Sequence, residues 1–396
     1  MQKFRFLYII ICIAALSACN DESYLNDLEN EDTIPKPVFI DITYNGGTAN
    51  VSIPSTAVGV SCASGTNTDV VLTLDDAALT EYIYRVKGSS ASGSLTINSN
   101  YKLTLLLAGV DLTSTAVTPA MHINCGKRVS VILQEGTENS FTDNASNDKK
   151  GAFYTKGHME IEGGGTLNVT GKARHALCSK EYMQLKKTTG TINIVGSVGD
   201  GIHCGKGDQD PLNNYFKMSG GTLNFSDIKG DLIDCDDYGN AYISGGTLNL
   251  TVDGSDVKGL KADSIVEISG GTLNIDVSGM NAIGIQSNYA TYCSGGTITG
   301  TVSGTNAIGL KSNISSSSYV MEIDDEAGLI GCMFLSGRNI DLNVTGSGSR
   351  GIRTDKDLTA TGGVIALRGL SANSPGYKVK GTFSGSDYFS WTSTDE

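Results

Sequence analysis

Two nearly identical segments, "YISGGTLNLTVDG" at 242–254 and "EISGGTLNIDVSG" at 267–279, lie 25 residues apart. A Gly-Gly-Thr triplet recurs at this spacing, closed by Thr222, Thr247, Thr272 and Thr297, and looser copies end at Thr166 and Thr191. A fixed period of this length is the mark of a repeat architecture, in which each unit packs only against its neighbours. One elongated solenoid therefore explains the 396 residues better than two globular domains.

Each repeat has the pattern of three short strands separated by turns. In "GGTLNIDV", Leu273, Ile275 and Val277 alternate with polar residues, which is the two-residue period of a half-buried strand. "AIGIQS" and "YATYCSG" are two further strand candidates. Such a unit cannot bury its apolar face alone, but units stacked ~4.8 Å apart can. The sequence thus predicts an all-β fold, a single-stranded parallel β-helix of ~25-residue coils, roughly ten in number.

Three columns of residues test this arrangement. Leu223, Leu248 and Leu273 should stack inward on consecutive rungs, and Cys204 and Cys235 should share another inward column. An outward column holds Asn168, Asn193, Asn224, Asn249 and Asn274. Its amides could face a sugar, or they could hydrogen-bond to one another from rung to rung.

Three segments are expected along the chain. Residues 1–18 have the basic start, apolar run and small-residue end of a lipoprotein signal peptide, and "LSAC" resembles the bacterial lipobox, with Cys19 as the lipidated first residue. Residues 19–37 are acidic and aperiodic, and form a tether. Residues 38–396 form the parallel β-helix, with irregular N-terminal coils, an interruption at 313–334 and a C-terminal cap that includes Trp391.

The acidic segment "NDES", which directly follows Cys19, resembles the export signal of Bacteroidetes surface lipoproteins. We therefore expect a lipid-anchored, monomeric protein of the outer membrane that is exposed on the cell surface. The net charge of −13 becomes −15 without residues 1–18, which contain two basic and no acidic residues. An acidic surface disfavours nucleic acid as a partner and suits divalent cations.

The cysteines and histidines of this sequence show no pattern of a disulfide framework, a zinc site or a catalytic triad. Seven cysteines remain after Cys12 and Cys19, an odd number scattered through the repeats, which predicts buried free thiols rather than disulfides: Cys62, Cys125, Cys178, Cys204, Cys235, Cys293 and Cys332. No zinc spacing is present. The four histidines, His122, His158, His175 and His203, show no pairing that suits a metal or a catalytic triad.

A column of aspartates is the strongest chemical signal. The ninth residue after each repeat threonine is, in order, His175, Asp200, Asp231, Asp256, Asn281 and Asn306. Three successive rungs thus present an aspartate near one place, and Asp234, Asp236, Asp237 and Asp263 lie close by. Stacked carboxylates repel one another unless a cation lies between them, and Ca²⁺ takes oxygen ligands at ~2.3–2.6 Å.

The sequence therefore predicts a Ca²⁺ site with Asp200, Asp231, Asp234, Asp236, Asp237 and Asp256 as candidate ligands. The alternative is a set of solvated aspartates that simply favour turns. Asn281 and Asn306 are interpreted as turn residues.

The repeats contain four distinctive motifs: "KGAFYTKGHMEIEGGGTLNVTG", "RHALCSKEYMQL", "GDGIHC" and "VEISGGTLNI". Through these motifs, most of residues 70–365 resemble the bacterial β-helix carbohydrate-binding domains of the clostridial "Cthe" type. The resemblance implies a right-handed parallel β-helix similar in fold to family 9 pectate lyases, bound calcium, and affinity for plant cell-wall polysaccharide, including acidic pectic chains. Asp200 matches the family's "DGIK"-like turn best, Asp231 lacks the following glycine, and Asp256 lies two residues further from Gly259.

Three functions remain open. The first is binding of an acidic pectic polysaccharide, with Ca²⁺ linking protein and sugar carboxylates and with Tyr238, Tyr242 and Tyr292 as sugar-stacking candidates. The second is a calcium-dependent pectate lyase in which Lys261 is the base, which resembles the lysine beside calcium-binding aspartates in family 9 lyases; the alternative for Lys261 is a salt bridge. The third is a surface adhesin or spacer without specific sugar chemistry.

Overall fold

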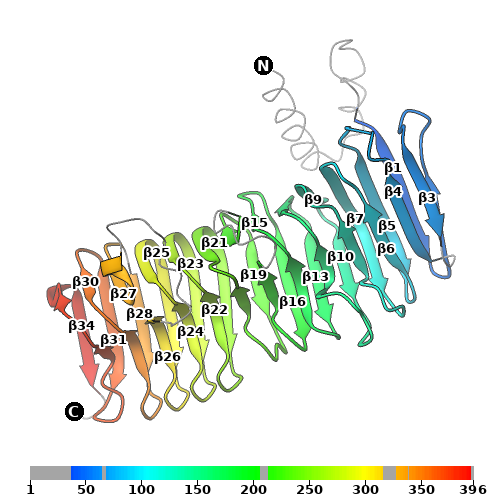
Figure 1. Ribbon diagram of the computed structural model, residues 1–396. Helices are drawn as coiled ribbons and strands as arrows, with labels where there is room; N and C mark the ends of the chain where they lie inside the picture. Colours follow the sequence, from blue (N-terminus) through cyan, green and yellow to red (C-terminus); the bar gives the residue numbers. More distant parts are fainter. Residues whose placement is uncertain (1–36, 65–67, 206–212, 315–326, 338, 394–396) are drawn as a thin grey trace, which may run out of the picture.

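The structure is a computed structural model that describes residues 37–64, 68–205, 213–314, 327–337 and 339–393. The predicted signal peptide, the lipidation residue Cys19 and nearly all of the predicted tether lie outside the described residues. Stacked coils follow one another from the N-terminal to the C-terminal end of an elongated molecule (Figure 1). Helix in the described part is limited to two 3₁₀ turns, η2 (Ala327–Leu329) and η3 (Ser386–Tyr388).

Two sheets contain the strands, and the predicted parallel solenoid is confirmed. In the 13-stranded sheet every strand after β3 pairs in parallel, so twelve rungs are stacked, rather than roughly ten. Its strands are β3 (Val60–Ser64), β4 (Asp69–Leu74), β6 (Ser94–Asn98), β8 (Met121–Asn124), β11 (Gly151–Thr155), β14 (His175–Ser179), β17 (Ile202–Cys204), β20 (Ile233–Cys235), β22 (Lys258–Ala262), β24 (Ile283–Ser287), β26 (Ile308–Ser312), β29 (Arg350–Thr354) and β32 (Tyr377–Val379).

The 21-stranded sheet supplies the other two sides of each coil. Its strands are β1 (Phe39–Asn45), β2 (Thr48–Ser52), β5 (Ile83–Ser90), β7 (Leu103–Thr113), β9 (Val129–Leu133), β10 (Glu138–Thr142), β12 (Met159–Glu162), β13 (Thr166–Gly171), β15 (Met183–Leu185), β16 (Thr191–Ser197), β18 (Tyr215–Met218), β19 (Thr222–Phe225), β21 (Asn240–Val252), β23 (Val266–Val277), β25 (Ala290–Val302), β27 (Cys332–Leu335), β28 (Asn339–Val344), β30 (Leu358–Ala360), β31 (Val364–Leu370), β33 (Phe383–Ser384) and β34 (Phe389–Ser393).

The Gly-Gly-Thr triplet makes the bend between these two sides. β18 and β19 are separate strands, yet both pair with β21, which runs through the bend without a break. Gly246 adopts φ 84° there, a left-handed conformation that glycine tolerates. A Cβ on Gly246 would lie 2.6 Å from the carbonyl oxygen of Gly221 on the preceding coil. The repeat therefore keeps glycine because the coils approach each other closely at this corner.

The interior consists of the predicted columns. Leu223 pairs with Leu248 and Leu248 with Leu273 on consecutive rungs, and all three side chains are fully buried. Cys204 and Cys235 are paired in the same way. The seven cysteines in the described residues are free thiols, as predicted, but Cys62 is exposed rather than buried because it lies on β3, at the edge of its sheet.

The outward asparagines form a hydrogen-bonded ladder. Asn193 Nδ2 donates to Asn168 Oδ1 at 2.8 Å, and the same bond recurs from Asn224 to Asn193 at 2.8 Å, from Asn249 to Asn224 at 2.6 Å and from Asn274 to Asn249 at 2.7 Å. These amides satisfy one another across the rungs. The column therefore stabilises the stacking of the coils, which is the second of its two interpretations.

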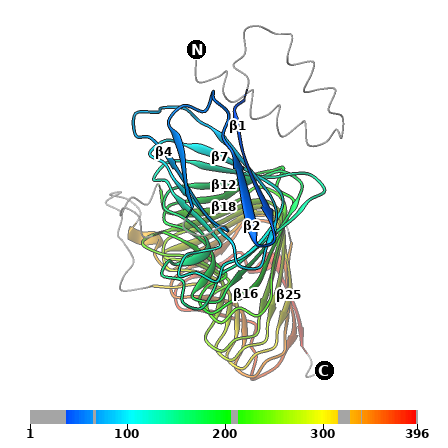
Figure 2. The ribbon, with the colours of Figure 1, turned by 90° about the vertical axis from the view of Figure 1, so that its right-hand side faces the viewer.

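The two ends of the described solenoid differ. At the N-terminal end, β1 pairs antiparallel with β2 and β3 antiparallel with β4, and these hairpins lie over the first coils (Figure 2). At the other end, β34 still pairs in parallel with β31, so the predicted cap continues the solenoid. Rings of Phe383, Phe389, Tyr377 and Trp391 pack against one another there. No helix in the described residues has the length and apolarity needed to span a membrane.

Candidate functional site

Asp200 and Asp231 lie one above the other at the turns that lead into β17 and β20. The pairing of Ile202 with Ile233 fixes this register. The backbone N–H of Asp231 donates to Asp200 Oδ1 at 3.0 Å, and the N–H of Lys258 on the next coil donates to Asp231 Oδ1 at 2.8 Å. Both side chains are mostly buried, with 16% and 15% of their surface exposed. Two of the predicted calcium ligands are thus brought together as expected.

The third rung differs from the prediction, because Lys258 and not Asp256 lies next to Asp231. Asp256 adopts a left-handed φ of 61°, and its Oδ1 accepts a hydrogen bond from Asn281 Nδ2 at 3.1 Å. Asn306 Nδ2 continues this second row by donating to Asn281 Oδ1 at 3.4 Å. The three residues form a separate ladder of turn residues. Asp256 therefore does not join the group around Asp200 and Asp231.

Asp234 and Lys261 form the centre of a second, adjoining cluster on paired positions of β20 and β22. Lys261 Nζ lies 2.9 Å from Asp234 Oδ1, 3.5 Å from Asp236 Oδ1 and 3.4 Å from Asp263 Oδ1. Asp234 is buried, with 8% of its surface exposed. One ammonium group thus faces three carboxylates, which leaves an excess of negative charge. Asp237, a predicted ligand, has φ 52° in the following turn and lies outside this cluster.

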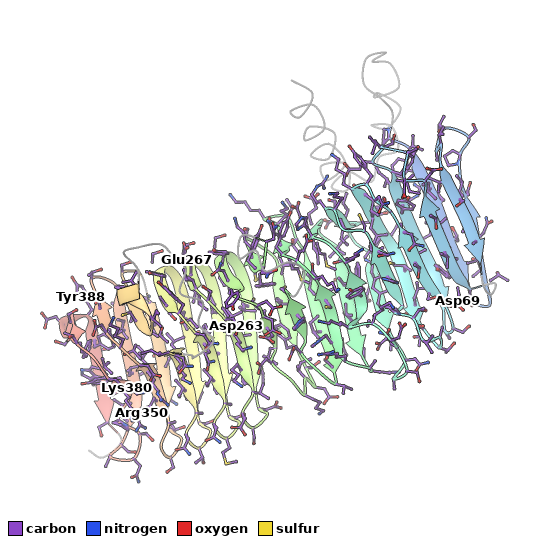
Figure 3. The ribbon with its side chains drawn as sticks, in the orientation of Figure 1. Asp69, Asp263, Glu267, Arg350, Lys380 and Tyr388 are labelled. Carbon is purple, nitrogen blue, oxygen red and sulfur yellow. The ribbon has the colours of Figure 1, made fainter. Side chains whose placement is uncertain are left out.

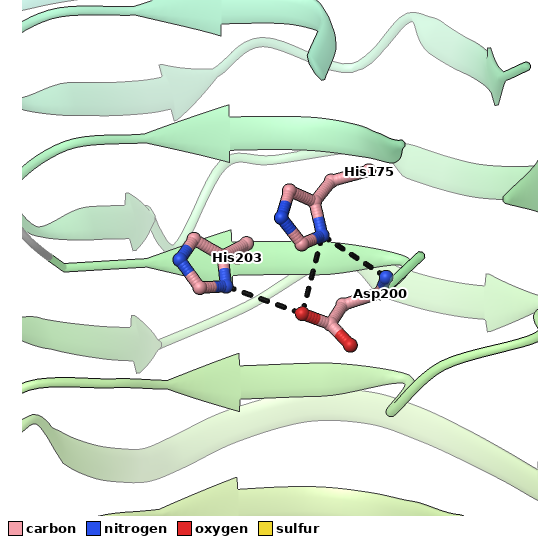
Figure 4. A group of neighbouring side chains, drawn as sticks. All are labelled: His175, Asp200 and His203. Atoms are coloured by element: carbon pink, nitrogen blue, oxygen red, sulfur yellow. Dashed lines mark hydrogen bonds and ion pairs between the residues drawn. The ribbon is translucent and has the colours of Figure 1, made fainter. Parts of the chain in front are cut away.

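His175 and His203 lie beside Asp200 (Figure 4), where the three could hold a metal ion, whereas the sequence showed no histidine pairing that suits a metal. Their rings stack with centroids 4.3 Å apart, and Asp200 Oδ2 lies 3.1 Å from His175 Nδ1 and 3.2 Å from His203 Nδ1. His203 Nδ1 is also 3.7 Å from Asp234 Oδ2, and its Nε2 is 4.0 Å from Asp236 Oδ2. His203 therefore links the Asp200 turn to the Asp234 cluster.

The protonation of the site follows from burial and from these neighbours. Burial, against the opposing charge of Lys261, raises the pKa of Asp234 to about 7, and the charges of Asp200 and Asp236 add to the rise. Burial also raises the pKa of Asp231 above its usual value. Burial disfavours the charge on Asp200, but the neighbouring imidazoles of His175 and His203 outweigh it and hold the pKa of this carboxyl below its usual range.

The spacing of the ligand atoms fits a shared cation. One atom from each of Asp200, Asp231 and Asp234 lies within 4.8 Å of the others, and the same holds for the sets His175–Asp200–His203 and His203–Asp234–Asp236. Two oxygens bound to one Ca²⁺ can be up to about 5 Å apart, given ligand distances of ~2.3–2.6 Å. A cation would also favour the ionised forms of Asp231 and Asp234, whose pKa values are raised by burial and, to a lesser degree, by neighbouring carboxylates. The carboxylate set could therefore hold a metal ion.

Lys261, the candidate base of the lyase alternative, is an ion-pair partner of Asp234. Burial opposes the charge on Lys261, but the carboxylates of Asp234, Asp263 and Asp236 outweigh it and raise the pKa of the ammonium above its usual value. A protonated amine cannot accept a proton. The salt-bridge interpretation of Lys261 therefore matches its surroundings.

Two of the three candidate tyrosines lie elsewhere on the solenoid. Tyr242 and Tyr292 project from β21 and β25, separated by Glu267 on the rung between them, and thus belong to the other sheet. The Tyr292 ring stacks on Phe334 at 5.1 Å, so one of its faces is covered, and Tyr215 packs edge-on against Tyr242 at 5.9 Å. Tyr238 has φ 66° in the turn before β21. The described structure brings Tyr242 and Tyr292 neither to each other nor to the carboxylates.

Comparisons with known proteins place the chain in a family. Among curated proteins none matches it. One solved structure, a polysaccharide lyase-like protein from C. thermocellum studied as a gadolinium derivative, is 14% identical with a TM-score of 0.35 and covers 89% of this chain and 99% of its own. A family model matches residues 67–324, which is more than half of the chain. The chain therefore belongs to the family described as carbohydrate-binding domain-containing proteins.

Proposed function

We propose that this protein binds acidic plant cell-wall polysaccharide, of the pectic type, with the help of Ca²⁺ held by Asp200, Asp231 and Asp234. The observation that carries the proposal is the group of three carboxylates whose ligand oxygens lie within 4.8 Å of one another. Membership in a carbohydrate-binding family supports the sugar as ligand. When bound, Ca²⁺ supplies a positive charge that takes carboxylates of the glycan as further ligands.

The side chains around the three carboxylates have distinct tasks in this proposal. Backbone N–H groups of Asp231 and Lys258 hold the Asp200 and Asp231 carboxylates in place, and His203 orients Asp200. Lys261 compensates part of the charge of Asp234. A protein with a net charge of −13 repels a polyanion over most of its surface, so a cation bound at the three carboxylates would favour this ligand there.

Replacing Asp231 by asparagine tests the proposal. Asn keeps the oxygen that accepts the Lys258 N–H but removes one charge, so the variant should fold as the wild type and bind Ca²⁺ at least about tenfold more weakly. Its affinity for polygalacturonate should fall as well, and excess Ca²⁺ should partly restore it. Calorimetry with Ca²⁺ and then with polygalacturonate measures each step.

Asp256→Asn is the matched control, since it removes the same charge from a neighbouring turn outside the group. It should leave both affinities unchanged. Wild-type affinity for polygalacturonate that is the same in chelator would reject the calcium link. Absence of retention on any polysaccharide would instead favour the spacer function.

We also propose that Cys19 anchors the protein by lipid to the outer membrane, with the solenoid exposed on the cell surface. Only the sequence around Cys19 supports this. Cys19→Ala should leave the precursor unprocessed or release the protein from the membrane fraction. Fractionation and electrophoretic mobility identical to those of the wild type would show that Cys19 is not the anchor.

A further inference from the structure

The outward row that contains Asp234 and Lys261 becomes basic toward the C-terminal end. On successive rungs, Lys261 is followed by Gln286, Lys311, Arg353 and Lys378, paired in register. Arg350, at the start of β29, and Lys380, directly after β32, flank this row, and both are labelled near the C-terminal end in Figure 3. We call Lys311, Arg350, Arg353, Lys378 and Lys380 the basic strip.

Charge within the basic strip is only partly neutralised. Asp355 Oδ1 lies 3.0 Å from Lys380 Nζ and 3.5 Å from Arg353 Nη2. Lys311 Nζ instead donates to the neutral Gln286 Oε1 at 3.4 Å. Arg350 Nη1 donates to the carbonyl oxygens of Gly348 and Ser349, at 2.6 and 2.7 Å. One carboxylate is thus shared by two cations, and two further cations are bonded to uncharged groups.

Two further observations indicate unsatisfied donors and mutually repelling cations at this place. The Nε atoms of Arg350 and Arg353 are buried and have no hydrogen-bond partner in the described part of the chain. Burial lowers the pKa of Lys311, and the charge of Arg353 is the next largest cause. Lys258 and Lys380 also lower this pKa, whereas the carboxylate of Asp355 raises it. An anion bound beside these groups would be stabilised by charge-assisted hydrogen bonds.

The shape of the strip favours a linear ligand. Lys311, Arg353 and Lys378 lie on three consecutive rungs, ~4.8 Å apart along the solenoid axis. This spacing is close to the length of one sugar residue in a polysaccharide. A nucleic acid would extend beyond the strip onto a protein of net charge −13, which opposes it. A chain lying along the row would also reach the Asp234 cluster, since both belong to the same face of the 13-stranded sheet.

We propose that the basic strip is a second subsite for the carboxylates of an acidic polysaccharide, one that acts without a metal. It rests on the proposed function for the identity of the ligand class and adds a direct contact between protein cations and sugar anions. The polysaccharide then crosses two kinds of site on one face. At the aspartate turns its carboxylates meet a cation, and on the strip they meet lysine and arginine.

The test uses the double variant Lys311→Gln/Arg353→Gln and polygalacturonate as the probe. Affinity should fall roughly tenfold, both with Ca²⁺ and in chelator, because two charge-assisted contacts are lost in each condition. Its dependence on salt concentration should become weaker, since fewer charges are screened. The control Lys87→Gln/Lys127→Gln removes two exposed lysines from the N-terminal coils and should bind as the wild type.

A second variant, Lys378→Gln/Lys380→Gln, alters two exposed residues of the strip and should show the same direction of change if the first does not fold. Fully methyl-esterified polygalacturonate, which has no charge, should bind all variants alike. Equal affinity of wild type and both strip variants for polygalacturonate in chelator and in Ca²⁺ would overturn the proposal. Failure of the calcium link gives a different result, namely that chelator does not change the affinity of the wild type for polygalacturonate.

Discussion

Lys261→Met is expected to lower the free energy of unfolding by about 3–5 kcal/mol at pH 8 in chelator, the range seen when one partner of a buried ion pair is removed. The reason is that Lys261 is the ammonium group facing Asp234, Asp236 and Asp263, and Asp234 is buried. Methionine fills a similar volume, so the loss reports charge rather than packing. Added Ca²⁺ should restore a large part of the stability, because a cation can replace the missing charge.

The same variant should lose less at pH 5. The raised pKa of Asp234, about 7, means that the folded protein holds this proton more tightly than the unfolded chain does. This group therefore stabilises the fold below the usual aspartate pKa and loses that contribution as pH rises toward 7. Urea unfolding at both pH values measures the difference, with Lys217→Met on β18 as the control. Equal stability of Lys261→Met and wild type at pH 8 in chelator would contradict the ion-pair role.

Leu248→Ala is expected to cost about 2–5 kcal/mol, since it opens a cavity in the middle of the inward leucine column. Leu248 is fully buried between Leu223 and Leu273, and neither neighbour can move far without breaking its own rung. The loss should appear as a lower urea midpoint for the central coils. Thr247→Ala, on the outward side of the same strand, should change stability by less than about 0.5 kcal/mol.

Hydrogen exchange locates the effect of this cavity. Coils contact mainly their neighbours, so amides of β19, β21 and β23 should lose protection first, and those of the N-terminal strands last. Uniform loss of protection along the whole chain would show that the solenoid unfolds as one cooperative unit. Unchanged stability of Leu248→Ala would mean that the column does not carry the core.

The fold could be predicted because one signal repeats. The threonines of the Gly-Gly-Thr triplets from Thr222 to Thr297 are equally spaced in the sequence and pair with one another in the structure. The number of coils was harder to predict, since the coils before Thr166 lack the triplet at this spacing. Register in those coils depends on side-chain packing, which a single sequence does not reveal.

The site was predicted only in part, because the turn before the second strand differs in length between coils. Counting from the threonine places Asp256 beside Asp231, but the second strands pair Ile233 with Leu260, which places Lys258 there instead. Aligning "GIHC", "LIDC" and "GLKA" would have given this register, because the rung is defined by the strand and not by the turn before it. The left-handed Asp256 absorbs the difference in turn length.

The histidines were missed because their pairing depends on three dimensions. His175 precedes β14's buried Leu177 and His203 follows Ile202 by one residue, so no sequence spacing relates them. Their stacking arises because His175, the first residue of β14, and His203, the middle residue of β17 on the next rung, are not partners in the strand register and yet their rings meet. The position of Lys261 next to the aspartates could be predicted, since strand pairing alone places it beside Asp234.

The asparagine ladder has a direction. In each of its four bonds the amide of the later coil donates to the oxygen of the earlier one, so the side-chain dipoles point the same way along the axis and add to one another. At the donor end Asn168 Nδ2 meets the Glu138 carboxylate, and at the acceptor end Asn274 Oδ1 receives the Thr299 hydroxyl. The ladder thus acts as a small macrodipole with an anion at its positive pole, the arrangement that also favours acidic residues at helix N-termini.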